Sequence, residues 1–139
     1  MMDWDPNILL APDKEPCRIY ADDKGEFYAL VSPEDYQWAI QWCWSPKWPR
    51  GGGSVYLRRN VQIGNRANRI QSNLFLHRAI MMERMKIDPP TPEHTIVDHE
   101  DGDGLNCQRG NLRWFTPSQN ARNRRKNFDR EAFRRRLGL

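Results

Sequence analysis

In the first half of the chain, short apolar runs are separated by turn residues. This pattern predicts small antiparallel strands. Strands are expected over 17–21 and 26–31, because residues 22–25 (Asp-Asp-Lys-Gly) are typical of a tight turn with glycine at a positive φ. Ser32 then predicts the N-cap of a short helix, since proline and two acidic residues follow it. Residues 1–16 contain three prolines and little periodicity, so we expect an extended arm.

A second hairpin is expected over 42–47 and 55–60, around the glycine-rich segment 49–53. Residues 62–72 are polar and predict a loop, whereas the apolar residues 74–85 predict a buried helix. Side chains alternate across the strand 55–60, which leaves one face for the core and one for a nucleic-acid backbone. The two faces consist of Tyr56, Arg58 and Asn60, and of Val55, Leu57 and Arg59.

A third pair of strands is predicted near the C-terminal side. Ile96-Val97 predicts a short strand that ends on the adjacent Asp98 and His99, and a second strand is expected over 111–115 after a glycine-rich loop. Residues 116–119 (Thr-Pro-Ser-Gln) have the spacing of a capping box with proline at the first helical position, so a helix begins there. The element order predicts an α+β fold.

Four polar residues of this unit suggest chemistry. Asn120 and Asn123 share one face of the predicted helix and are expected to point back toward Asp98 and His99. Carboxylate and amide oxygens suit Mg²⁺, which takes few protein ligands. A neutral imidazole beside such an ion can accept a proton from water, and phosphodiester hydrolysis requires both parts.

Charge is segregated along the chain, which has 22 Lys and Arg, 18 Asp and Glu and a net charge of +4. Residues 1–35 hold nine acids, whereas no acid occurs over 36–82, and residues 109–139 hold ten basic residues and two acids. This segregation favours a nucleic-acid partner over the alternative of a solvated basic tail.

Several classes of protein and site are not supported. The chain of 139 residues has no apolar stretch that spans a membrane and no signal pattern, so we expect a single-domain cytoplasmic protein without a membrane partner. Cys17, Cys43 and Cys107 form no Cys-x-x-Cys pair, so we expect buried thiols and no zinc. Trp42 and Trp44 are expected in the core rather than on a base-stacking surface.

The sequence resembles the HNH nucleases, the ββα-metal class, and within them the phage and intron-encoded homing endonucleases. The resemblance spans about residues 74 to 125, and Cys107 departs from it because this subgroup often has a second asparagine there. The matching motifs are Leu76-His77-Arg78, Val97-Asp98-His99 with Asp101-Gly102-Asp103 and Leu105-Asn106, Asn111-Leu112-Arg113, and Gln119-Asn120 with Asn123.

This resemblance implies a role for each matching residue. His99 would be the general base, and Asp98 with Asn120 would bind one divalent ion, with Mg²⁺ expected and Mn²⁺ as the alternative. Asn111 would bond the backbone of the catalytic loop and so hold His99 in place. The supporting positions are His77, Arg78 and Asn123, of which His77 is either a structural histidine, the preferred interpretation, or a metal ligand.

The resemblance also implies a substrate and a domain plan. The expected partner is double-stranded DNA, which the chain would cleave as a monomer, nicking one strand, or as a homodimer. A non-catalytic DNA-binding protein on the same scaffold and an RNA-directed nuclease are the alternatives. The expected DNA contacts are Arg58, Arg59, Arg113, Arg122, Arg124, Arg125 and Lys126. The expected plan is an arm over 1–16, one nuclease domain over 17–126 made of a β-rich leader (17–72) and an HNH core (74–126), and a basic tail over 127–139.

Overall fold

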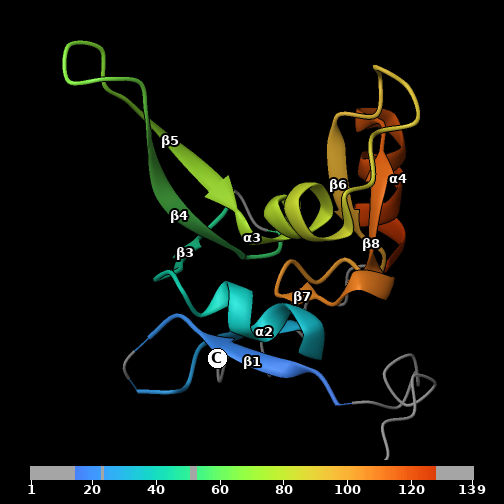
Figure 1. Cartoon of the computed structure of the whole chain (residues 1–139). Coiled ribbons are helices and arrows are strands. Elements are labelled where there is room, and N and C mark those ends of the chain that lie inside the picture. The colour runs from blue at the N-terminus through green and yellow to red at the C-terminus, as the bar shows by residue number, and fades with distance from the viewer. Residues whose placement is uncertain (1–14, 23, 51–52, 128–139) are drawn as a thin grey trace, which may run out of the picture.

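The computed structural model describes residues 15–22, 24–50 and 53–127, except for the side chains of 123–127. Within these residues the strands form three small sheets, with short helices between them (Figure 1). This architecture confirms the predicted α+β class. The predicted arm and basic tail lie almost entirely outside the described residues.

The first sheet joins the start of the described chain to a strand within the HNH-like C-terminal part. β1 (Cys17–Tyr20) pairs antiparallel with β2 (Tyr28–Val31), which confirms the predicted hairpin, and Gly25 in the turn has a φ of 71°. β7 (Asn106–Cys107) adds to β2 in parallel. No pattern predicted β7, because a two-residue strand formed by backbone pairing has no periodicity to detect.

The second sheet contains a long hairpin that projects from the body (Figure 1). β3 (Ser45–Lys47), β4 (Tyr56–Ile63) and β5 (Ile70–Phe75) are antiparallel in that order. The predicted loop over 62–72 is correct for residues 64–69 and wrong at both ends, where β4 continues to Ile63 and β5 begins at Ile70. Side chains on both faces are exposed there, so the alternation that marks a half-buried strand is missing although the backbone ladder continues.

The helix predicted over 74–85 begins two residues later. β5 ends at Phe75, and α3 (Leu76–Ala79) continues directly as a π-helical segment (Ile80–Met85). Lys86 ends it in the left-handed conformation, at a φ of 55°. Leu76, Ile80 and Met81 are buried, so the predicted burial is confirmed.

The third sheet and the last helix match their predictions. β6 (Ile96–His99) pairs antiparallel with β8 (Leu112–Phe115), and a short 3₁₀ turn (Arg109–Asn111) precedes β8. α4 (Pro117–Asn127) begins at the predicted capping box. The backbone N–H of Thr116 donates to the Gln119 side chain at 3.0 Å, and the backbone N–H of Gln119 donates to the Thr116 hydroxyl at 3.2 Å.

The core lies where these sheets and helices meet. Its largest fully buried aliphatic side chains are Leu57, Leu76, Ile80, Met81 and Leu105. Trp44 is buried, as predicted, and its indole N–H donates to the Ala39 carbonyl at 2.8 Å. The prediction of buried thiols is correct for Cys107 but wrong for Cys43, which is exposed.

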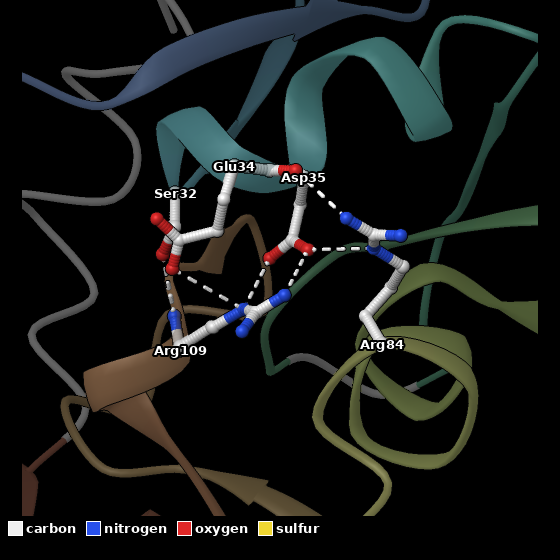
Figure 2. A network of polar contacts seen from close by, with 5 residues as sticks. All are labelled: Ser32, Glu34, Asp35, Arg84 and Arg109. Carbon is white, nitrogen blue, oxygen red and sulfur yellow. Dashed lines mark hydrogen bonds and ion pairs between the residues drawn. The ribbon is translucent and has the colours of Figure 1, made fainter. Parts of the chain in front are cut away.

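A buried carboxylate connects the N-terminal half to the C-terminal half (Figure 2). α2 (Pro33–Ala39) has Ser32 at its N-cap position, as predicted, although the Ser32 side chain does not cap the helix, and α2 places Asp35 at 0% exposure. Arg109 donates to both carboxylate oxygens, at 2.7 Å from Nη2 and 2.9 Å from Nε, and Arg84 donates at 3.1 Å. The hydrogen bond to Asp35 raises the pKa of Arg109. We call Asp35, Arg84 and Arg109 the Asp35 network.

Candidate active site

A cavity of about 200 Å³ lies between the base of the β4–β5 hairpin, β6 and the first turn of α4. It brings together three of the residues predicted to carry chemistry, Asp98, His99 and Asn120, and the supporting residue His77. Residues more than 40 positions apart in the sequence thus face one space. The remaining lining residues are Tyr56, Phe75, Ile96, Val97 and Gly102.

His99 is the last residue of β6 and is buried, with 4% of its surface exposed. Burial lowers its pKa from 6.5 to about 3, because the imidazolium form loses hydration. The ring is therefore neutral at neutral pH, and a neutral imidazole can accept a proton. Its centroid lies 4.6 Å from that of His77 and 5.5 Å from that of Tyr56, and its Nε2 lies 3.9 Å from the Cys107 sulfur.

Asp98 precedes His99 and is equally buried, at 4% exposure. Arg113, its cross-strand neighbour on β8, donates from Nε to the Asp98 Oδ2 at 3.1 Å. The same guanidinium lies 4.1 Å from the centroid of the Phe115 ring. Arg113 was predicted to contact DNA, and the structure places it on the carboxylate expected to bind the metal ion.

Asn120 reaches the cavity because of where α4 begins. Its backbone N–H donates to the Thr116 carbonyl at 3.0 Å, so it lies one turn after the capping residue. The capping box holds that first turn, and the half-buried Asn120 side chain lines the cavity with Asp98. α4 and β6 together therefore place one amide and one carboxylate at the same space.

Asn111 bonds the loop that follows His99. Its Nδ2 donates at 2.9 Å both to the Asp101 carboxylate and to the Asn106 carbonyl, and its Oδ1 accepts from the Asp101 N–H at 3.1 Å. Its backbone carbonyl accepts from the Glu100 N–H at 2.8 Å. These four hydrogen bonds fix the start and the far end of the loop relative to β8.

His77 on α3 packs between two rings beside His99. Its ring centroid lies 5.3 Å from that of Tyr56 and 5.6 Å from that of Phe75, and its Nδ1 is buried without a hydrogen-bond partner. Burial lowers the pKa of His77 well below its usual value, and the neighbouring His99 and Arg78 lower it further. His77 is therefore neutral as well.

Residues 74–122 match the family model for HNH endonucleases. This part of the chain belongs to the HNH endonuclease family. The matched segment contains the four polar residues at the cavity and Asn111. No curated protein and no solved structure matches the chain. The match names no subgroup, so the phage and intron-encoded subgroup stays a prediction.

The residues of this HNH segment fit a hard divalent cation. HNH nucleases generally use a divalent metal, and the cavity offers a carboxylate at Asp98 and an amide oxygen at Asn120, the donor types that Mg²⁺ prefers. Among the described residues, no group of three or more His, Cys, Asp and Glu gathers to hold a metal ion. Two oxygen donors leave most of an octahedral shell to water and substrate oxygens.

The arginines predicted to contact DNA or support the site differ in placement. Arg58 is half-buried on the face of β4 that carries Tyr56. Arg59 lies on the opposite face, with its guanidinium 4.2 Å from the centroid of the Trp42 ring and its Nε buried. That position on the core side differs from the DNA contact predicted for Arg59. Arg78 donates to the Thr95 carbonyl at 2.9 Å, which connects α3 to the start of β6.

The other predicted contacts lie on α4. Arg122 is exposed. The side chains of Asn123, Arg124, Arg125 and Lys126 lie outside the described residues, so their predicted roles stay predictions. None of the described helices is long and apolar enough to cross a membrane.

Two aromatic residues of the HNH site were not predicted. Tyr56 and Phe75 come from the hairpin and line the cavity beside both histidines. The alternation along β4 already separated Tyr56 from the buried Leu57, but only the pairing of β5 with β4 shows that Phe75 faces the same way.

Proposed function

We propose that this chain is a metal-dependent DNA endonuclease in which His99 is the general base and Asp98 and Asn120 hold one divalent ion. The observation that carries the proposal is the meeting of these three side chains at one cavity. His99 is in the neutral form that a general base needs, and its lowered pKa also makes the ring a weaker proton acceptor.

In the proposed reaction His99 removes a proton from a water molecule, and the oxygen attacks the phosphorus opposite the 3′ oxygen. The bond between phosphorus and the 3′ oxygen breaks, and that oxygen takes a proton from solvent, which leaves 5′-phosphate and 3′-hydroxyl ends. A divalent ion, when bound, neutralises the charge that develops on the phosphate. Asn111 keeps the loop after His99 in place through its four hydrogen bonds.

Duplex DNA is the proposed substrate. The basic residues of the chain gather over 36–82 and 109–139, and several exposed cations in contact with phosphates supply sequence-independent affinity. One cavity cleaves one strand, so a monomer would nick, whereas a double-strand break requires two copies or two events.

The test is cleavage of supercoiled plasmid with Mg²⁺ or Mn²⁺, with and without EDTA, beside a binding assay on the same samples. We expect the wild type to produce open-circular DNA and His99→Ala to bind but not cut. His94→Ala is the matched control, because His94 lies in the segment before β6 and does not line the cavity. Binding without cleavage by the wild type on several plasmids would favour the non-catalytic alternative, and stronger binding of RNA than of duplex DNA would favour the RNA-directed one.

A further inference from the structure

The β4–β5 hairpin carries a set of amide side chains on one face. The register pairs Asn60 with Asn73 and Gln62 with Gln71. Cross-strand partners point to the same side of a sheet, so these four carboxamides form two adjacent rows. All four residues are exposed, and within the described part of the chain their side chains make no hydrogen bond. We call them the amide face.

The amide face continues into the cavity. The next pair along the ladder is Arg58 with Phe75, and Tyr56 follows on the same side of β4. Tyr56 and Phe75 both line the cavity with His99. A ligand that extends from the cavity along this side of the hairpin therefore meets first Arg58 and then the four amides.

The composition of the hairpin indicates an anionic ligand with polar edges. Residues 56–75 contain four arginines and no acid. Asparagine is disfavoured in strands. Two asparagines paired across this exposed ladder therefore make the hairpin less stable than residues with a higher strand propensity would. Residues that disfavour the secondary structure they occupy are expected at functional sites.

We propose, on the basis of the proposed nuclease function, that the amide face reads base edges of duplex DNA in the major groove beside the cleaved bond. The major groove admits a two-stranded β-ribbon, and the side chains of Asn and Gln pair with adenine through its N6 and N7. The preferred base is therefore adenine, and the arginines of the hairpin other than Arg59 supply phosphate contacts that position the ribbon.

The geometry predicts the size of the recognised site. Residues on one face of a strand are spaced by about 7 Å, which is about two base-pair steps. The two rows of amides begin one such interval beyond Arg58 and Phe75. We expect a recognition window of about four base pairs on one side of the nick.

The test is selection from a library of random-sequence duplex DNA with the full chain carrying His99→Ala, so that binding is measured without cleavage. We expect enrichment of adenine at two or more neighbouring positions. Each lost bidentate pairing corresponds to about 5- to 150-fold in discrimination. Nicking of the selected duplex by the wild type then locates the window relative to the cut.

Replacing all four amides with alanine should abolish the base preference and leave low-salt affinity for unselected duplex within about threefold, because phosphate contacts remain. The matched control is Gln37→Ala with Gln41→Ala, two exposed amides at and after α2. That control should keep the preference. Circular dichroism shows whether each variant is folded.

A single substitution decides the question if the quadruple variant does not fold. Asn73→Arg should move the preference at one position from adenine to guanine, since arginine pairs with guanine O6 and N7. A folded quadruple variant or Asn73→Arg protein with the original preference would overturn the inference. Absence of any preference in the starting protein would overturn it too, although plasmid nicking by the wild type would still support the proposed function. Base selection by a wild type that does not nick would support the amide face and contradict the nuclease.

Discussion

Two neutral histidines beside the candidate metal ligands affect stability as well as chemistry. The pKa of His99 falls to about 3 on folding because the ring is buried, and burial lowers the pKa of His77 too. Below about pH 6.5 the unfolded chain binds protons that the folded chain does not. The free energy of unfolding should therefore be greatest above that pH and decline as the pH falls toward 3.

For His99 the expected slope is about 1 kcal/mol per pH unit in this window. Urea denaturation in EDTA at pH 7.5, 6 and 5 measures it. His77→Phe keeps an aromatic ring between Tyr56 and Phe75 and should reduce the pH dependence of the free energy of unfolding. His94→Ala should leave the part of this pH dependence that comes from His77 and His99 unchanged. Stability that stays constant from pH 7.5 to pH 5 would contradict the burial of neutral histidines.

Gly104 is needed where the loop after His99 passes over the start of β4. A Cβ atom at this position would overlap the Val55 carbonyl oxygen and lie 2.7 Å from the Tyr56 ring. We expect Gly104→Ala to lower the free energy of unfolding by about 1 to 3 kcal/mol, the usual cost of overpacking, and to displace Tyr56 from the cavity.

Gly110→Ala is the control, because a Cβ there meets nothing within 4 Å. Chemical denaturation and plasmid nicking measure the two effects of Gly104→Ala. An alanine at 104 that is as well tolerated as one at 110 would show that the loop does not pass this close to β4.

The location of the candidate site residues was more predictable than that of their neighbours. Asp98, His99 and Asn120 lie in short motifs whose strand and helix are marked in the sequence, and the structure brings them to one cavity. Arg59 was assigned to a DNA surface because charge indicates exposure, although a guanidinium can also cover tryptophan rings. Tyr56 and Phe75 depend on pairing between segments, which a one-dimensional pattern does not contain.

At the scale of elements, the first turn of α4 determines where Asn120 lies. Thr116→Ala removes the hydroxyl that accepts the Gln119 N–H, and loss of such a cap costs about 1 kcal/mol. We expect a smaller free energy of unfolding and weaker binding of Mn²⁺, because Asn120 loses its fixed position.

Ser118→Ala is the matched control, since Ser118 is exposed in the same turn and takes no part in the capping box. Manganese titration followed by electron paramagnetic resonance, with thermal unfolding in parallel, measures both effects. Equal Mn²⁺ affinity of the two variants would contradict the prediction that Asn120 binds the ion.

Elements were predictable where local chemistry marks their ends. The capping box gave the start of α4, and the Asp-Asp-Lys-Gly turn gave the first hairpin. The outer ends of β4 and β5 were assigned to the loop over 62–72 because neither strand has a buried face there. β7 exists only through pairing with β2, and the sequence cannot indicate a partner 76 residues away.

At the scale of the whole molecule, the Asp35 network should be a principal source of stability. Asp35→Asn removes the charge that faces two arginines, and breaking a buried ion pair costs about 3 kcal/mol or more. Glu34→Gln is the control, because Glu34 is 47% exposed and its contact with Arg109 should contribute less than about 1 kcal/mol. Chemical denaturation of both variants measures the difference, and equal losses would contradict a buried network.

Binding to DNA should depend strongly on salt. If six or more cations of the chain contact phosphates, affinity for duplex DNA should fall about 10³-fold or more between 50 and 200 mM salt. Fluorescence anisotropy with a labelled duplex measures this slope. A flat response would contradict the interpretation of the segregated basic residues as a polyanion surface.

The pairing of β7 with β2 has a consequence for how much of the chain the matched segment needs. The family match begins at residue 74, yet a strand inside it is completed by β2, and Arg84 and Arg109 are neutralised by Asp35. A fragment that contains only residues 74–122 would therefore carry the candidate site residues without the strand that pairs with β7 and without the carboxylate that faces Arg84 and Arg109. Transfer of the matched segment to another protein would therefore require a substitute for the β2 edge and for the Asp35 carboxylate.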